Sequence, residues 1–170
     1  MMDINISKLK NLNVILLCGL YGSGKTKFAN MYFKGTGRSR ISRTEIRKLI
    51  FEMVNFGEPW TPDKFTDEDD FLIKHVERKI TEQFLHDKKN VLLVNTFMSK
   101  NSRLKFIRMS KDMNKTIGAV FLDIPLEKCR ANNEHGTVRV PEIVLNALHS
   151  KKELPSPEEG FNEVLTIKNF

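Results

Sequence analysis

The sequence predicts a three-layer α/β/α sandwich with a mainly parallel sheet of about five strands and a helical lid. Apolar runs of strand length alternate with amphipathic helical segments, and such alternation gives right-handed crossovers and a parallel sheet covered on both faces. The first apolar run leads directly into a glycine-rich turn and a helix, which is typical of the P-loop NTPase type of this fold. The chain has 170 residues and no internal repeat, so we expect one domain over residues 1–170.

The glycine-rich turn at residues 19–26 is predicted to be a phosphate loop. It satisfies the pattern G-x-x-x-x-G-K-[ST], with Gly19, Gly24, Lys25 and Thr26 at the fixed positions. Glycines let the loop coil with its N–H groups toward phosphate oxygens, and the lysine can neutralise the β- and γ-phosphates. We therefore expect a nucleoside triphosphate, ATP or GTP, with Mg²⁺ bound by Thr26. The residues expected to bind the nucleotide here are Gly19, Tyr21, Gly22, Ser23, Gly24, Lys25 and Thr26.

The elements after this loop follow from apolar spacing and from helix-stop signals. Residues 25–33 are predicted to form a helix that ends at the glycines of 35–37, and residues 38–42 a short polar strand. Residues 44–56 are predicted to form a helix with Thr44 as its N-cap. The apolar residues on one face of this helix are Ile46, Leu49, Ile50 and Met53.

A proline-containing loop then precedes the longest predicted helix, at about residues 66–88. Its aromatic residues Trp60 and Phe65 either pack the loop down or stack on a nucleobase. The helix carries an apolar residue at every fourth position, and this spacing predicts the face that it buries. Those residues are Leu72, Val76, Ile80 and Phe84.

The second half of the chain repeats the order of strand and then helix. Apolar runs predict its strands, and Pro125 fits the first turn of one of its helices. The strands expected over the whole chain are 14–18, 38–42, 91–96, 116–124 and 161–167. The helices expected in the second half are 101–113, 125–133 and 141–149.

The charge balance favours an anionic partner. Lys and Arg outnumber Asp and Glu by 28 to 21, which gives a net charge of +7 and suits nucleic acid. We expect the basic segment 38–43 to lie beside the site and to bind oligonucleotide through Arg38 and Arg40. No apolar stretch has the length of a membrane helix, and the N-terminus lacks signal-peptide character, so we expect a cytoplasmic protein without membrane contact. Cys18 and Cys129 are expected to be small buried apolar residues.

The ordered set of motifs resembles the kinase domain of polynucleotide 5′-hydroxyl kinases. The phosphate loop is followed by Ile-Ser-Arg-x-Glu-Ile-Arg, by Asn-Thr after a strand, and by a segment similar to the lid helix of that family. The matching segments together span about residues 13 to 168. They are 19–26, 41–47, 95–103, 127–133 and 154–161.

The resemblance implies transfer of the γ-phosphoryl group of ATP to a hydroxyl of nucleic acid, most simply the 5′-OH end of DNA or RNA. Arg47 would contact the phosphate of the acceptor end, and lid arginines would stabilise charge on the transferring group. The catalytic residues expected are Lys25, Thr44, Glu45, Arg47 and Arg139, with Arg130 as a further nucleotide contact. The substrate-binding residues expected are Arg43, Arg47, Asn95 and Arg103.

Two positions depart from the family pattern. Thr44 stands where family members have an aspartate, the presumed base, and Val94 stands where relatives often have an acid near the magnesium water shell. A hydroxyl can orient an acceptor but cannot take its proton at neutral pH. Glu45 points about 100° away from Thr44 on a helix. The acids of the 63–70 loop, Asp63 and Asp67 among them, reach the acceptor only if that loop folds over the site.

Three functions are therefore open. The first is a polynucleotide 5′-kinase, and the second is a kinase for a nucleotide, modified base or other small-molecule hydroxyl, with Thr44 reflecting a different acceptor. The third is a nucleotide-dependent binding or regulatory protein whose transfer chemistry has weakened. A panel of acceptors distinguishes the first two, and Thr44→Asp tests the third.

Overall fold

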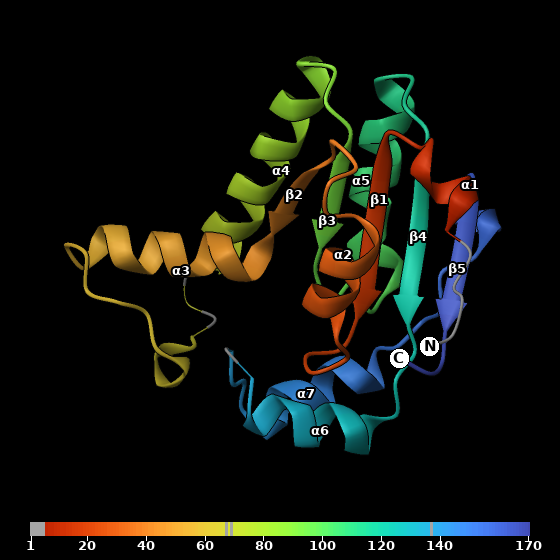
Figure 1. Cartoon of the computed structure of the whole chain (residues 1–170). Helices are drawn as coiled ribbons and strands as arrows, with labels where there is room; N and C mark the ends of the chain where they lie inside the picture. Colours follow the sequence, from red (N-terminus) through yellow and green to blue (C-terminus); the bar gives the residue numbers. More distant parts are fainter. Residues whose placement is uncertain (1–5, 67, 69, 137) are drawn as a thin grey trace.

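The computed structural model describes residues 6–66, 68, 70–136 and 138–170. Its centre is a five-stranded sheet in the order β2-β3-β1-β4-β5, and every neighbouring pair of strands is parallel (Figure 1). This confirms the predicted sheet. The strands are β1 (Val14–Gly19), β2 (Ser39–Ser42), β3 (Val91–Val94), β4 (Ile117–Leu122) and β5 (Glu163–Ile167).

Helices cover both faces of the sheet and its carboxyl edge. In Figure 1, α2 lies in front of the sheet, α5 lies behind it, and α6 and α7 lie beyond the carboxyl ends of the strands. The helices are α1 (Ser7–Lys10), α2 (Lys25–Tyr32), α3 (Arg43–Val54), α4 (Asp70–His86), α5 (Lys100–Asp112), α6 (Leu126–Glu134) and α7 (Glu142–Ser150). Two 3₁₀ turns, η1 (Pro62–Lys64) and η2 (Pro157–Glu159), and the short α1 are additions to the sequence prediction.

The three central strands form the core. Every residue of β1, β3 and β4 is buried, as expected for parallel strands covered on both faces. Cys18 and Cys129 are both free and buried, which confirms their predicted character. None of the helices in the described part of the chain is long and apolar enough to cross a bilayer.

Helix α4 begins at Asp70, about four residues after its predicted start, and α3 and α6 each begin one residue away from theirs. Helix α3 begins at Arg43 and its N-cap is Ser42, whose φ of −122° and ψ of 120° are extended, so the expected N-cap Thr44 is wrong. Helix α6 begins at Leu126, and Pro125 is its N-cap and not part of its first turn. A proline fits this position because its missing N–H costs a helix start nothing.

The buried face of α4 is not the one that apolar spacing predicted. The buried residues are Ile73, Glu77, Thr81 and Leu85, one position later than the predicted stripe. Leu72 is exposed, and the other three residues of the predicted stripe are only partly buried. Glu77 and Thr81, at the centre of this buried face, are polar. Hydrophobic spacing alone therefore selects the neighbouring apolar residues at the edge of the face.

Candidate functional site

The phosphate loop follows β1 and packs directly against α6. Gly22 has a φ of +79°, and a Cβ at this position would lie 2.2 Å from the carbonyl oxygen of Cys129. Asn132 Nδ2 also donates a hydrogen bond of 2.8 Å to the Gly22 carbonyl. Glycine is therefore required at position 22 both by the backbone conformation and by the close approach of α6.

Lys25 lies at the start of α2 with its ammonium turned into the loop. Its Nζ donates to the carbonyl oxygens of Gly19 at 2.8 Å and Leu20 at 2.7 Å. Desolvation lowers the pKa of Lys25 from 10.5 to about 8. The ring of Tyr21 lies 5.7 Å from the same Nζ. The Lys25 ammonium and the N-terminal end of α2 therefore lie together in the loop, and both favour a bound anion.

A pocket of about 630 Å³, here called the phosphate-loop pocket, opens above this loop. Thr44 and Glu45 at the start of α3 line one side, and Asn132 and His135 of the α6 region line the other. Glu45 is ion-paired with Arg40. The other sequence-predicted residues on its walls are Tyr21, Gly22, Gly24, Lys25, Thr26, Val94 and Asn95.

The residues of the phosphate-loop pocket suit a Mg²⁺ ion that is held mainly by the phosphates of a bound nucleotide and by water. Within the described part of the chain, no group of three or more His, Cys, Asp or Glu side chains could hold a metal ion. The hydroxyl-bearing Thr26 lines the pocket beside Lys25. Mg²⁺ in kinase sites keeps most of its water and binds through one or two protein ligands plus substrate phosphates, so a single threonine hydroxyl suits it.

A second pocket, of about 540 Å³ and here called the adjoining pocket, shares Tyr21, Asn95 and Thr96 with the phosphate-loop pocket. Its walls differ sharply in character. The cationic wall consists of Arg43, Arg47 and Lys74 of α3 and α4, and the apolar wall of α7 consists of Ile143, Val144, Ala147 and Leu148, with Lys151 directly after that helix. Asp70 is the one carboxylate among the described residues that line it.

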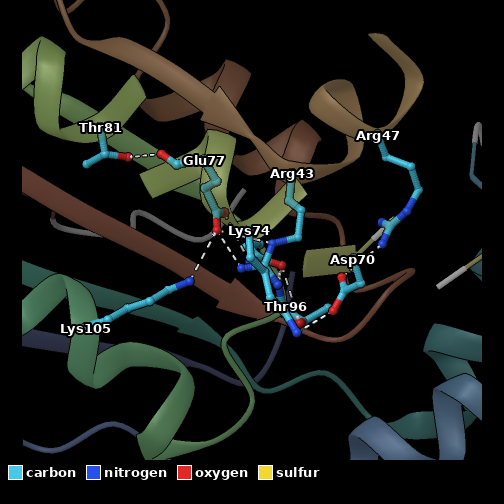
Figure 2. Close-up of polar contacts among 9 residues, drawn as sticks. Arg43, Arg47, Asp70, Lys74, Glu77, Thr81, Thr96 and Lys105 are labelled. Carbon is cyan, nitrogen blue, oxygen red and sulfur yellow. Dashed lines mark hydrogen bonds and ion pairs between the residues drawn. The ribbon is translucent and has the colours of Figure 1, made fainter. Parts of the chain in front are cut away.

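Glu77 fixes two of the pocket residues from behind (Figure 2). It is completely buried, and its Oε2 accepts hydrogen bonds from Nε and Nη2 of Arg43. Its Oε1 accepts from Asn95 Nδ2 at 3.2 Å, and Lys105 Nζ lies 3.9 Å from Oε2. A buried carboxylate needs such partners, because an unpaired one would carry a large desolvation cost. Glu77 has no local signal in the sequence, because its partners Arg43 and Asn95 lie 34 and 18 positions away.

Asp70 lies between two cations at the first residue of α4 (Figure 2). Arg47 Nη2 is 3.3 Å from Asp70 Oδ1, and Lys74 Nζ contacts Oδ2. Arg47 is buried, and its guanidinium carbon lies 4.8 Å from the centre of the Phe65 ring. Phe65 meets Tyr21 edge-on at 6.3 Å. Phe65 therefore shapes the adjoining pocket.

The structure decides between the two roles expected for Trp60, packing the loop down or stacking on a nucleobase. Its side chain is buried, and Lys48 Nζ lies 5.0 Å from its ring centre. Trp60 packs the loop down.

Asp63 is exposed and lines a third pocket, which it shares with Phe65 and Arg139. Asp67 lies outside the described residues.

Arg103 does not lie where the expected contact with substrate requires it. Its side chain is completely buried. Nε and Nη2 donate to Glu159 at 2.8 and 2.6 Å, and Nη1 donates to the carbonyls of Phe97 and Glu153 at 2.8 and 2.9 Å. Arg103 joins α5 to η2 and the preceding loop, which corrects the substrate-binding assignment.

The lid arginines are also displaced from the phosphate-loop pocket. Arg130 is held on the α7 side of α6 by Glu127 at 2.6 Å, Asn146 at 2.8 Å and Glu142 at 3.1 Å, and it does not line the phosphate-loop pocket. Arg139 lies on the wall of the third pocket, of about 550 Å³, and not on the phosphate-loop pocket.

The basic segment 38–43 does not form one surface. Arg38 donates to the carbonyl oxygens of Lys10, Leu12, Asn13 and Val91, at the amino edge of the sheet. That edge lies opposite the phosphate loop, so the expectation that Arg38 lies beside the site is wrong. Arg40 lines the phosphate-loop pocket and Arg43 the adjoining pocket.

Comparisons with known proteins agree with this architecture. The family model described as AAA domain matches residues 14–155. The bifunctional polynucleotide phosphatase/kinase of Schizosaccharomyces pombe (strain 972 / ATCC 24843) is 26% identical over 137 residues, which cover 78% of this chain. This chain spans 31% of the length of that relative.

Solved structures show the same fold at low sequence identity. A sugar kinase from Janibacter sp. HTCC2649 has a TM-score of 0.64 and 17% identity, with 92% of this chain and 85% of that chain covered. Kti12 of Chaetomium thermophilum, in complex with ADP-AlF3, has a TM-score of 0.61 and 13% identity, with 91% and 88% covered. The chain belongs to the AAA domain family and has the fold of P-loop kinases.

Proposed function

We propose that this protein transfers the γ-phosphoryl group of ATP to a hydroxyl of nucleic acid, most simply the 5′-OH end of DNA or RNA. The observation that carries the proposal is the junction of two pockets at Tyr21, Asn95 and Thr96. One pocket contains the phosphate loop, and the other has a cationic wall. A phosphoryl donor and an anionic acceptor bound in these pockets would meet at their shared boundary, as transfer requires.

The donor side rests on the phosphate loop. Lys25 would neutralise the β- and γ-phosphates, and the backbone N–H groups of residues 19–26 would bind their oxygens. Thr26 would hold Mg²⁺ together with the phosphates. The bound ion would neutralise charge on the phosphates. The similarity to Kti12 in complex with ADP-AlF3 supports a nucleotide in this position.

The acceptor side rests on the arginines of α3. Arg43 and Arg47 reach the adjoining pocket from successive turns of one helix, and planar guanidinium groups bind phosphate in two-pronged geometry. Lys74 and Lys151 add two more cations to the pocket lining. The relative from fission yeast, whose name includes polynucleotide kinase, supports a nucleic-acid end as the acceptor.

Thr44 lies on the donor side of this arrangement. Its hydroxyl would orient groups at the transferring phosphate, while Glu45 is held by Arg40. Phosphoryl transfer depends mainly on positioning and on charge neutralisation, so a threonine at this position is compatible with turnover.

Labelled transfer tests the proposal. The protein is incubated with γ-labelled ATP and separate 5′-OH DNA, 5′-OH RNA, nucleoside, nucleotide and sugar acceptors. Lys25→Ala serves as the blank, and Lys34→Ala, which changes an exposed lysine outside the two pockets, serves as the matched control. Label on the 5′-OH oligonucleotides that disappears in Lys25→Ala and persists in Lys34→Ala is the expected result. No label on any oligonucleotide contradicts the proposal.

A small-molecule acceptor is the second candidate, and the apolar wall of α7 favours it. Ile143, Val144 and Leu148 line the same pocket as Arg43 and Arg47, and such an apolar wall suits a ring of limited size. The structural similarity to a sugar kinase supports the same candidate. Label on a nucleoside, nucleotide or sugar, with none on oligonucleotides, would establish this second function in place of the first.

A further inference from the structure

We propose that Asp70 is the general base that takes the proton of the acceptor hydroxyl. This inference rests on the proposed function. Two carboxylates line the two pockets among the described residues: Glu45 in the phosphate-loop pocket and Asp70 in the adjoining pocket. The side chain of Glu45 is 56% exposed and paired with Arg40, on the side where the triphosphate would bind. Asp70 is the carboxylate on the acceptor side.

The carboxylate of Asp70 is held at both oxygens. Arg47 contacts Oδ1 and Lys74 contacts Oδ2, and the side chain is 29% exposed (Figure 2). Arg47 is itself fixed by burial and by its stacking on Phe65. A base fixed in this way loses little conformational freedom on meeting the substrate, which is the condition for effective proton transfer.

Arg47 then couples acceptor binding to proton transfer. It is the residue expected to contact the phosphate of the acceptor end, and it holds Oδ1 of Asp70 in the same pocket. An acceptor anchored on Arg47 would therefore present its hydroxyl close to Asp70. Thr44 lines the phosphate-loop pocket and has a neutral hydroxyl, so it cannot accept the proton of the acceptor.

In the transfer step, one bond to the γ-phosphorus forms and one breaks. The acceptor oxygen forms a bond to the γ-phosphorus, and the bond between that phosphorus and the bridging oxygen of ADP breaks. The bridging oxygen leaves with the electron pair as part of ADP. The hydroxyl proton passes to a carboxylate oxygen of Asp70, which releases it to solvent after the product leaves. In a loose transition state the acceptor oxygen has formed little bond to phosphorus, so its proton leaves late and the transfer asks little of a base.

Asp70→Asn tests the inference in the full chain, with the acceptor that wild-type protein labels. We expect kcat to fall by about 10² to 10⁴, the usual contribution of general base catalysis. The affinity for ATP should stay at the wild-type value, because Asp70 does not line the phosphate-loop pocket. Glu82→Gln is the matched control, since Glu82 is an acid of the same helix that pairs with Lys79 and lies outside both pockets.

Chemical rescue separates a base from a structural residue. Formate added to Asp70→Ala should restore part of the lost kcat, because a small carboxylate can occupy the space of the missing one. If Asp70→Asn fails to fold, Asp70→Glu decides the matter, because it keeps the charge but moves the carboxylate by one methylene. We expect a lowered kcat for Asp70→Glu with unchanged ATP affinity.

The outcomes distinguish the two proposals. Wild-type transfer with an undiminished kcat in Asp70→Asn overturns the role of Asp70 and leaves the proposed function standing. A reduced kcat in Asp70→Asn without any formate rescue of Asp70→Ala also counts against a base. Wild-type protein that labels no acceptor overturns the proposed function, and the role of Asp70 falls with it.

Discussion

Arg43 and Glu77 form an ion pair that joins α3 to α4 behind the adjoining pocket. The Glu77 side chain is completely buried, while that of Arg43 is 14% exposed and reaches the pocket wall. Asn95, at the end of β3, is bound by the other oxygen of Glu77. One carboxylate therefore sets the positions of a cation and an amide that come from separate elements of the fold.

Replacement of Glu77 should lower the free energy of unfolding. Glu77→Gln leaves Arg43 without its counter-charge, and removal of one partner of a buried pair typically costs about 3 to 5 kcal/mol in the free energy of unfolding. Urea denaturation measures this loss. Glu82→Gln, which breaks a solvent-exposed pair on the same helix, should leave the free energy of unfolding nearly unchanged. Equal losses in the two variants would contradict the central place of Glu77.

Arg103 should prove a structural residue. Arg103→Met removes four hydrogen bonds that tie α5 to Glu159, Phe97 and Glu153, and leaves the Glu159 carboxylate buried without its partner. We expect a loss of about 3 kcal/mol or more in the free energy of unfolding. Arg108→Met, at an exposed position of α5, is the control and should be nearly neutral. A raised acceptor KM with unchanged stability would instead restore a substrate role.

ATP affinity should weaken above pH 8. Desolvation lowers the pKa of Lys25 to about 8 in the protein without nucleotide, and the phosphates of ATP would favour the charged ammonium and raise it again. Binding then takes up a proton above pH 8, so the Kd should rise by up to about tenfold per pH unit there and stay flat below. Titration of ATP between pH 7 and 9.5 measures this.

Lys25→Arg is the control for that pH dependence. Its guanidinium stays protonated over the whole range, so the rise in Kd above pH 8 should disappear in this variant. A wild-type Kd that is constant from pH 7 to 9.5 would show that Lys25 does not control nucleotide binding through its charge.

Thr44→Asp should change turnover little if Asp70 is the base. Position 44 lines the phosphate-loop pocket, so a new carboxylate would lie with the donor phosphates and not with the acceptor. The expected measurement is a kcat close to that of wild type. A rise of about 100-fold, the scale of general base catalysis, would instead identify a protein whose transfer chemistry has weakened through loss of a carboxylate at this position.

The elements of the fold were predictable because their signals are local. Continuous apolar runs marked β1, β3 and β4, whose residues are all buried, and the phosphate-loop pattern marked the turn between β1 and α2. Asn95, expected from the family resemblance, lines both pockets directly after β3, where the carboxyl ends of parallel strands meet at one edge of the sheet.

The unpredicted features depend on partners that are distant in sequence. Glu77 belongs to the buried face of α4 only because Arg43 and Asn95 are brought to it, 34 and 18 positions away. The family resemblance assigns Arg103 to substrate, and its real partner Glu159, 56 positions away, gives no local signal in the sequence. Arginines change role with their surroundings, so a match in sequence position alone does not fix what they bind.

The most direct test compares two acceptors that differ only at the 5′ end. One oligonucleotide carries a 5′-OH, and its matched control carries a 5′-phosphate; both have blocked 3′ ends and are incubated with the protein and γ-labelled ATP. The proposed function predicts label on the 5′-OH oligonucleotide alone, released as a 5′-labelled mononucleotide on digestion. Label on neither oligonucleotide, or equal label on both, would contradict it.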